Sequence, residues 1–207
     1  MSENIVSTST ALLAQLPSHI ADGDLVLRPW HSDDASALFP LAADPLVGPP
    51  AGWPPHKSVE ESRQVINEVF SVPGTYCVTV AGKIVGCVGL VPPDDLYAHL
   101  MRQFPDDQRV VEIGYWIGRS YWRHGYATRA ARCLLMEAFA HHRLDSVWGT
   151  HNTENAGSAA VMKNMGMREV STIANVPETR LDPSLMRDEV VCRASRVEFF
   201  AANPQHI

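Results

Sequence analysis

The stretch VVEIGYWIGRSYWRHGYATRAARCLLM, residues 110–136, contains three segments of different character. Residues 110–118 are rich in β-branched and aromatic side chains and predict a buried strand. Residues 119–125 are polar and basic and end in glycine, which predicts a turn. Residues 126–142 predict a helix because small and aliphatic residues share one face, namely Ala127, Ala130, Ala131, Leu134, Leu135 and Ala138.

The order strand, glycine-bearing turn, helix start predicts a phosphate-binding site. Backbone N–H groups at the start of a helix lack intrahelical partners, and the helix dipole is positive there. The dinucleotide fingerprint G-x-G-x-x-G and the nucleotide loop G-x-x-x-x-G-K-[ST] are both absent from this segment. The phosphate would therefore belong to another class of ligand.

Residues 122–127, W-R-H-G-Y-A, are flanked by Arg119 and Arg129 and include Arg123. They resemble motif A of the GNAT superfamily of acyl-CoA-dependent N-acetyltransferases, [QR]-x-x-G-x-[GA]. The longer string E-I-G-Y-W-I-G…Y-W-R-H-G-Y-A-T-R-A is most similar to the RimJ/RimL-like branch, the ribosomal-protein-type acetyltransferases. Trp122 stands where the superfamily has Gln or Arg, a departure that matters little if backbone N–H groups bind the pyrophosphate.

Composition restricts the class of protein. The chain has 207 residues, of which 45% are hydrophobic, enough for one well-packed core. Its formal net charge of −6 argues against a nucleic-acid binder and fits a cationic amine substrate. An apolar run of about eighteen residues is lacking, which predicts no membrane-spanning helix, and no secretory signal is visible. These features predict a cytoplasmic protein, with four scattered cysteines acting as small buried hydrophobes.

Residues 110–136 are called the organising stretch below. The residues before it predict one strand, two helices and a hairpin. The strand at 24–30 carries L-x-L-R-P, a second match to the RimJ/RimL-like branch. A helix capped by Ser32 or Asp33 is expected to about residue 43 and another over 57–70, joined by a proline-rich loop at 44–55. Strands at 75–80 and 83–90 flank Ala81-Gly82. Residues 92–109 predict an irregular polar loop, which would either cover the acceptor or be a surface excursion.

The residues after the organising stretch carry a second motif. Asn155 and Ser158 form N-x-x-S, in which Asn155 caps a helix that stops at Gly166. This resembles the N-x-x-S…K-x-G-F string of the same branch, with Lys163 one place early and Met167 in place of phenylalanine. Strands are expected at 146–150, 168–174 and 189–200, with a loop at 175–188.

The resemblance to this family implies one particular fold. It implies the α/β (α+β) GNAT fold, a mixed, mostly antiparallel sheet of about seven strands with helices on both faces. The strands at 110–118 and 146–150 would splay apart to admit the cofactor, and Gly114 is consistent with a bulge. We expect an N-terminal extension at 1–20, a single acetyltransferase domain at 21–200 and a tail at 201–207.

The resemblance also implies the cofactor site and the acceptor side. Acetyl-CoA would be the cosubstrate, and a metal is not expected because the neighbouring histidines lack ligand spacing. The expected cofactor-binding residues are Trp116, Ile117, Gly118, Arg119, Trp122, Arg123, His124, Gly125, Tyr126, Ala127, Thr128, Asn155, Ser158 and Lys163. Trp30, Trp53 and Tyr115 are candidates for the acceptor pocket, although Trp30 and Trp53 could equally pack against the sheet.

Acetyl transfer requires an amine that has lost its proton, a donor for the thioester oxygen and a donor for the leaving thiolate. Glu112 is the candidate base, because a carboxyl between Val111 and Ile113 would have a raised pKa. It could instead pair with an arginine or face solvent. The N–H of Trp116 or Ile117 would bind the oxygen, as the resemblance implies.

The third requirement is a general acid that donates to the leaving thiolate. The family often places a tyrosine where this chain has Met162, so Ser158, one turn earlier, is the candidate donor. Water, or a merely structural Ser158, are the alternatives. Tyr115 and Tyr126 are weaker candidates because one lies in the strand and the other borders the turn.

The sequence therefore predicts an N-acetyltransferase that moves an acetyl group from acetyl-CoA directly to a primary amine, either a protein N-terminus or a small molecule. The alternative is a catalytically silent acyl-CoA-binding regulatory module. A monomer or a homodimer is expected, without nucleic-acid or membrane partners.

Overall fold

The computed structural model describes residues 3–178 and 180–204. Within these residues one sheet of eight strands has the order β1-β2-β3-β4-β5-β6-β8-β7. Neighbouring strands are antiparallel except β5 and β6, which are parallel. The strands are β1 (Ile20–Asp22), β2 (Leu25–Arg28), β3 (Thr75–Val80), β4 (Lys83–Val91), β5 (Val110–Ile117), β6 (Ser146–Asn152), β7 (Arg168–Glu178) and β8 (Asp182–Ser195).

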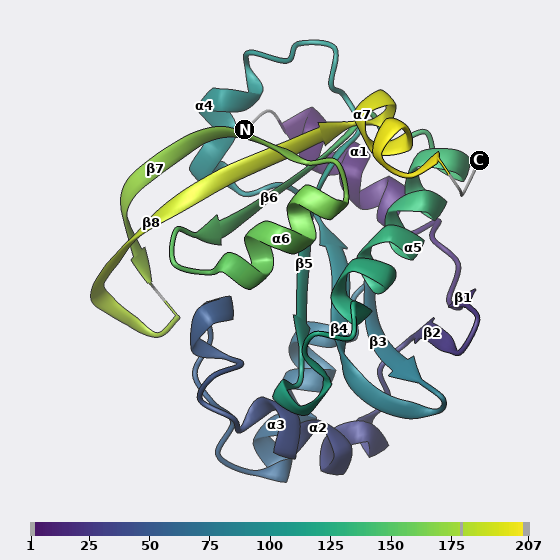
Figure 1. Cartoon of the computed structure of the whole chain (residues 1–207), viewed down its shortest axis with the longest axis vertical. Coiled ribbons are helices and arrows are strands. Elements are labelled where there is room, and N and C mark those ends of the chain that lie inside the picture. The colour runs from purple at the N-terminus through teal and green to yellow at the C-terminus, as the bar shows by residue number, and fades with distance from the viewer. Residues whose placement is uncertain (1–2, 179, 205–207) are drawn as a thin grey trace.

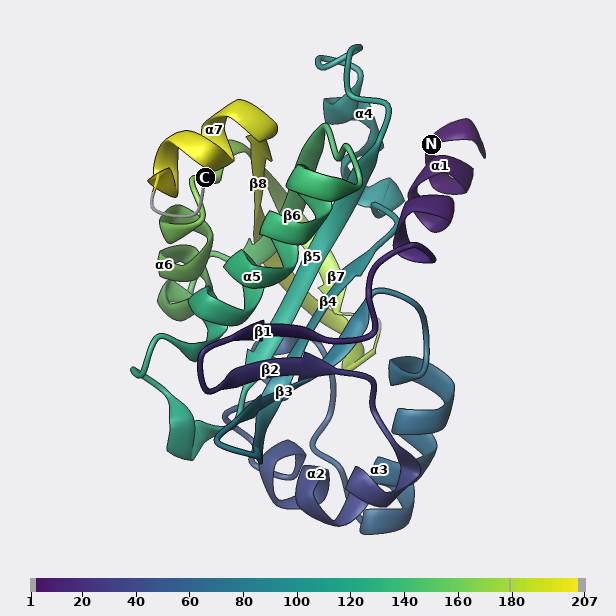
Figure 2. The same cartoon turned by 90° about the vertical axis from the view of Figure 1, so that its right-hand side faces the viewer.

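Helices cover both faces of this sheet (Figures 1 and 2). They are α1 (Glu3–Leu13), α2 (Ala35–Ala42), α3 (Val59–Val65), α4 (Ala98–Met101), α5 (Tyr126–His141), α6 (Ala156–Asn164) and α7 (Arg196–Ala202). Side chains of α5, α6 and α7 share the largest hydrophobic core with one face of the sheet. Two smaller cores, one with α2 and one with α4, lie on the opposite face. The predicted mixed fold with helices on both faces is confirmed.

The organising stretch folds as predicted, into β5, a short turn and α5. The predicted apolar face of α5 is buried from Ala130 to Ala138, because it lies on the centre of the sheet. Ala127, at the first turn, is only partly buried. This segment therefore supplies both the central strand and the helix that covers it.

The parallel pair β5 and β6 forms a wedge, as the splayed-strand prediction requires. Their pairing runs from Val110 with Ser146 to Glu112 with Trp148, while β5 continues to Ile117. The bulge expected at Gly114 is wrong, because Gly114 pairs with Gly89 of β4 in a continuous register. The gap opens because β5 and β6 diverge, and the pairing of β5 with β4 stays regular.

The sheet is larger than predicted at both edges. Residues 20–22 add the short strand β1 beside β2. Residues 175–178 and 182–188, within the segment expected as a loop, instead extend β7 and β8 into a long hairpin that curves away from the sheet (Figure 1). Most of the side chains in this extension are exposed, so the sequence shows little of the hydrophobic alternation that identifies strands.

The C-terminal strand ends earlier than predicted. β8 stops at Ser195, and residues 196–202 form α7 instead of continuing the strand to residue 200. Ser195 and Glu198 form a capping box, in which the Ser195 side chain accepts from Glu198 N and the Glu198 side chain accepts from Ser195 N. The predicted tail at 201–207 is thus partly helical, and its residues 205–207 lie outside the described residues.

The 92–109 segment is not an irregular loop throughout. It contains a 3₁₀ turn at Asp95–Tyr97 followed by α4. Tyr97, Leu100 and Met101 are buried against Trp148 of β6. The segment is tied down further by Asp107, whose carboxylate makes two 2.9 Å hydrogen bonds with the buried Arg193 of β8.

The N-terminal extension, whose residues 1–2 lie outside the description, forms α1 from Glu3 onward. Leu12 and Leu13 are buried in the largest core, and Ser9 donates to the carbonyl oxygen of Val110. Within the described residues, no helix is long and apolar enough to cross a membrane. Groups of three or more potential metal-ligating side chains are likewise not found in this part of the chain.

Candidate active site

The turn between β5 and α5 brings most of the expected cofactor-binding residues together, from Trp116 to Thr128. Gly125 is the N-cap of α5 and has φ +75°, a left-handed conformation that glycine adopts without strain. The first helical hydrogen bond runs from Arg129 N to Gly125 O, so the preceding N–H groups at the start of α5 need partners from outside the helix. Such N–H groups form an anion-binding site.

Trp122 fixes this turn to the end of the strand. Its indole Nε1 donates to the carbonyl oxygen of Ile117 over 2.6 Å. Arg123, the next residue, has φ +63°, a conformation that is unusual for a residue with a side chain. His124 bonds Trp122 O through Nδ1 and stacks on Tyr126. The departure from the family pattern at position 122 therefore has a structural use, since the indole holds the turn in shape.

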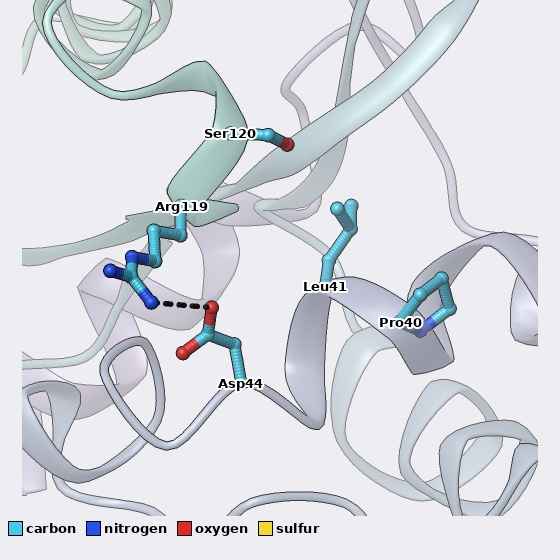
Figure 3. Close-up of a pocket in the computed structure, with 5 residues that line it drawn as sticks. All are labelled: Pro40, Leu41, Asp44, Arg119 and Ser120. Carbon is cyan, nitrogen blue, oxygen red and sulfur yellow. Dashed lines mark ion pairs between the residues drawn. The ribbon is translucent and has the colours of Figure 1, made fainter.

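The arginines near the turn have different partners. Arg119 lies 3.9 Å from Asp44 and, with its side chain 59% exposed, lines a cavity of about 380 Å³ together with Pro40, Leu41, Asp44 and Ser120 (Figure 3). Arg129 instead binds the β1–β2 hairpin, through Asp22 and Asp24. Of the two, Arg119 has the guanidinium that is more weakly held and more accessible to a phosphate.

Polar and apolar groups occupy different depths of the wedge between β5 and β6. At its base, the Met162 side chain of α6 lies against Gly149 of β6, close to Ile113 of β5. Further along β5, the Tyr115 hydroxyl contacts Ser158 in the first turn of α6. The base is thus apolar, and a pair of hydroxyl groups follows it.

The second motif positions Ser158 as predicted. Asn155 is the N-cap of α6, and its side chain accepts a hydrogen bond from Ser158 N over 3.0 Å. The same side chain donates to Pro50 O from the proline-rich loop. Lys163, also expected to bind the cofactor, is exposed in the last turn of α6, at the opposite end of the helix from Asn155.

Glu112 lies on the face of β5 opposite Tyr115 and is largely buried. Its Oε2 accepts hydrogen bonds from the Tyr97 hydroxyl at 2.6 Å and from Asp94 N at 3.1 Å. Burial raises the pKa of Glu112, and the Tyr97 hydrogen bond partly opposes this rise. A carboxylate with a raised pKa in a defined orientation suits a general base.

Tyr97, the hydrogen-bond partner of Glu112, is a candidate site residue that the sequence patterns did not identify. It is buried, and its ring stacks on Trp148 with centroids 5.4 Å apart and planes within 3°. The signal was the apolar spacing of Leu96, Tyr97, Leu100 and Met101 behind the capping residue Asp94. That pattern predicts a helical turn with a buried face, although it does not indicate what the phenol binds.

Beyond Glu112, the same face of β5 carries Gly114 and Trp116. A methyl group built on Gly114 would have nothing within 4 Å among the described atoms, so this position is open. Trp53 packs edge-on against Trp116 at 5.7 Å, and His56 contacts Trp53. This face of β5 therefore has a carboxylate at one end, an open glycine in the middle and an aromatic group at the other, and we call it the acceptor face because the acceptor is expected there.

The two tryptophans proposed for the pocket have different environments. Trp30 is buried beneath α2 and packs on Phe70, with ring centroids 5.1 Å apart. Trp53 stays partly exposed beside Trp116. Trp53 is consequently the one more accessible to an acceptor.

Two segments far apart in sequence meet on the acceptor face. Arg187 of β8 donates to Pro49 O at 3.1 Å and pairs with Glu178 of β7 at 3.2 Å. The outer part of β8 approaches the proline-rich loop in Figure 1, and Arg180 lies within electrostatic range of Glu112. The β7–β8 hairpin thus lies over this end of the sheet and contacts the proline-rich loop, and we call this hairpin the β7–β8 roof.

The comparisons with known proteins agree with this geometry. The family model described as acetyltransferase (GNAT) domain matches residues 24–168, well over half of the chain. The chain therefore belongs to the GNAT acetyltransferase family, a class of acetyl-CoA-dependent enzymes.

Individual relatives are more distant. An uncharacterized protein of Bacillus subtilis, YkkB, is 32% identical over 92 residues, covering 44% of this chain and 48% of its own, so the match spans about half of that relative. The FsC-acetyl coenzyme A-N(2)-transacetylase of Aspergillus fumigatus is 29% identical over 90% of this chain and 79% of its own. Mycobacterium smegmatis RimJ in complex with CoA-disulfide superposes with a TM-score of 0.62, at 20% identity over 87% of this chain and 89% of its own.

Proposed function

We propose that this chain transfers the acetyl group of acetyl-CoA directly to a primary amine. The observation that carries the proposal is the arrangement around β5. Glu112, with its raised pKa, lies on one face of this strand, and the Tyr115–Ser158 hydroxyl pair lies on the other. The wedge opens between them, so an amine and a thioester arriving from opposite faces would meet there.

The residues of the chain have separate tasks in this proposal. The turn at 119–128 binds the pyrophosphate through backbone N–H groups, with Arg119 adding charge. Glu112 accepts the amine proton, directly or through water, and contributes about 10²–10⁴-fold to the rate. The N–H of Trp116 or Ile117 binds the thioester oxygen, and Ser158 supplies the donor for the thiolate. Holding the two reactants together provides the rest.

The acceptor is proposed to be a small amine or a chain terminus. The β7–β8 roof restricts access to the acceptor face, which favours a slender substrate over a side chain on a folded surface. The name of the Aspergillus relative specifies an N(2) nitrogen as its acceptor, and the RimJ/RimL resemblance suggests protein N-terminal amines.

A thiol-release assay with acetyl-CoA and a panel of amines tests the proposal. The panel contains peptides beginning with Ala or Ser, α-amino acid derivatives and polyamines. Thiol release that depends on one acceptor class, and that is lost in Glu112→Gln, is the expected result. Tight CoA binding without release across the panel would instead indicate a catalytically silent acyl-CoA-binding module, and failure to bind CoA would overturn both functions.

A further inference from the structure

Two hydroxyl groups meet across the wedge. The Tyr115 oxygen lies 2.9 Å from Ser158 Oγ and 3.1 Å from the backbone carbonyl oxygen of Ser158. Tyr115 belongs to β5 and Ser158 to α6, so this contact joins the strand on one side of the wedge to the helix that follows the strand on the other side. The Tyr115 phenol thus extends from β5 to α6. In this part of the wedge the Met162 side chain of α6 offers no hydrogen-bond donor.

The hydrogen atoms of this pair have two possible arrangements. The carbonyl oxygen can only accept, and the phenol has one hydrogen to give. If Tyr115 donates to the carbonyl, Ser158 can donate its own hydrogen to the phenolic oxygen. If Tyr115 donates to Ser158 Oγ instead, the serine hydrogen is free for a third partner. Rotation of the phenol O–H therefore decides where the Ser158 hydroxyl points.

The place of the pair in the wedge suggests that third partner. Met162, Gly149 and Ile113 close the base with apolar atoms. Tyr115 lies two positions beyond Ile113 on the same face of β5, and Ser158 lies one helical turn before Met162. A thiol that reaches down the wedge from the 119–128 turn would meet these hydroxyl groups before it meets the apolar base.

We propose that Tyr115 is a positioning residue that turns the Ser158 hydroxyl toward the sulfur of CoA, so that Ser158 hydrogen-bonds the departing thiolate. The inference rests on the proposed acetyl transfer and deepens it. The amine nitrogen bonds to the acetyl carbon, the carbon–sulfur bond breaks, and its electron pair stays on sulfur. Glu112 holds the amine proton, while Tyr115 and Ser158 keep theirs.

This division of protons agrees with the environment of the phenol. Burial raises the pKa of Tyr115 above its ordinary value, although the Ser158 hydrogen bond opposes the rise. A thiol is a stronger acid than such a phenol, so the thiolate would not remove the phenolic proton. The pair therefore stabilises the thiolate as hydrogen-bond donors, and the Met162 side chain has no proton to supply.

The inference can be tested on the binary complex with CoA, without knowing the acceptor. The thiolate fraction of bound CoA is followed by its ultraviolet absorption during a pH titration, with the complex of desulfo-CoA subtracted to remove tyrosine ionisation. We expect Ser158→Ala to reduce the thiolate fraction about tenfold at a pH well below the thiol pKa, since one hydrogen bond to a charged group is lost. Tyr115→Phe should reduce it in the same direction, and the double variant should be no worse than Ser158→Ala.

Controls separate this effect from misfolding and from failure of the proposed function. Ser158→Thr retains the hydroxyl and should restore the thiolate fraction. Tyr76→Phe removes a phenol that donates to Pro17 O far from the wedge, and should change only stability. If CoA does not bind the wild-type chain, the proposed function fails. If CoA binds and its thiolate fraction is the same in wild type, Ser158→Ala and Tyr115→Phe, this inference is overturned while the proposed function stands.

Discussion

Tyr97 donates its phenolic hydrogen to Oε2 of Glu112 over 2.6 Å, joining the 92–109 segment to the first part of β5. Asp94 N donates to the same oxygen. Because both donors bind Oε2, we expect the other carboxylate oxygen, Oε1, to accept the amine proton. The stack of Tyr97 on Trp148 fixes the phenol in turn, so the orientation of the candidate base depends on a segment outside its own strand.

Replacing Tyr97 with phenylalanine should move the acid limb of the kcat/KM pH profile toward alkaline pH by about one pH unit. The phenol stabilises the charged carboxylate, and its hydrogen bond opposes the rise in the pKa of Glu112 caused by burial. Without it the pKa rises further, and a higher pH is needed to deprotonate the base. Tyr76→Phe, in which a buried phenol remote from Glu112 is lost, is the matched control and should leave the profile unchanged. An identical acid limb in Tyr97→Phe would contradict the role of Tyr97.

Glu112→Gln should reduce kcat by about 10²–10⁴-fold and at the same time stabilise the protein at high pH. Since burial raises the pKa of Glu112 in the folded chain, the wild type loses stability as pH rises from the unfolded value through the folded one. Glutamine does not ionise, so its stability advantage should grow across that window and be smallest below the unfolded pKa. Thermal unfolding of both proteins over a pH series measures this. A difference in melting temperature that is the same at every pH would show that the pKa of Glu112 is not raised on folding.

The sequence predicted those elements and site residues that are recognised from patterns of neighbouring residues. The β-branched and aromatic run of β5, the glycine at the start of α5 and the Asn155 cap are each recognised from neighbours within a few positions, so these elements were predicted correctly. Tyr97 differs because its role depends on Glu112 and Trp148, contacts that only the tertiary fold creates. The pairing of Tyr115 with Ser158 across 43 positions is of the same kind.

Two errors in the fold have other causes. The outer part of the β7–β8 hairpin is exposed and polar, so its strands are maintained by mutual pairing and give little hydrophobic signal. The helix α7 did carry a local signal, the S-x-x-E capping box at Ser195, but the apolar residues around it favoured a continued strand. Hydrophobic patterns cannot identify the exposed part of the β7–β8 hairpin, whereas the capping box does indicate the start of α7.

Gly125→Leu and Gly82→Leu form a matched pair of substitutions. Both glycines have nearly the same left-handed conformation, with φ +75° and +77°, and an added Cβ would contact nothing within 4 Å at either site among the described atoms. Each substitution should therefore destabilise the fold by about 1–2 kcal/mol. Only Gly125→Leu should weaken CoA binding, by tenfold or more, because its side chain occupies the place of the phosphate. Calorimetry and thermal melts measure both effects, and equal CoA affinities would remove the 119–128 turn as the pyrophosphate site.

Asp44→Asn should tighten CoA binding by up to about fivefold at low ionic strength. In the proposed site Asp44 would compete with the cofactor phosphates for Arg119, which lies 3.9 Å away, and would also repel them. Exposed pairs of this kind contribute at most about 1 kcal/mol, which sets the upper limit. Asparagine keeps an oxygen that can accept the hydrogen bond from Leu46 N, so the loop should retain its shape. The gain should shrink with added salt, and it should be smaller in the Arg119→Gln background, where only the repulsion is relieved. A gain of undiminished size in that background would show that Arg119 is not the phosphate ligand.

Arg187→Gln should raise KM for the acceptor while leaving the CoA dissociation constant unchanged. Arg187 joins the β7–β8 roof to the proline-rich loop through Pro49 O and also pairs with the largely buried Glu178. Glutamine cannot make both contacts, so the roof should loosen over the acceptor face while the turn at 119–128 is left intact. Arg168→Gln is the control, because it removes an exposed partner of Glu198, near α7 and away from the roof. Acceptor KM and CoA affinity measured on both variants distinguish the cases. If the acceptor KM of Arg187→Gln matches that of wild type, the acceptor does not enter beneath the β7–β8 roof. The acceptor would then enter from the open side of β5 at Gly114.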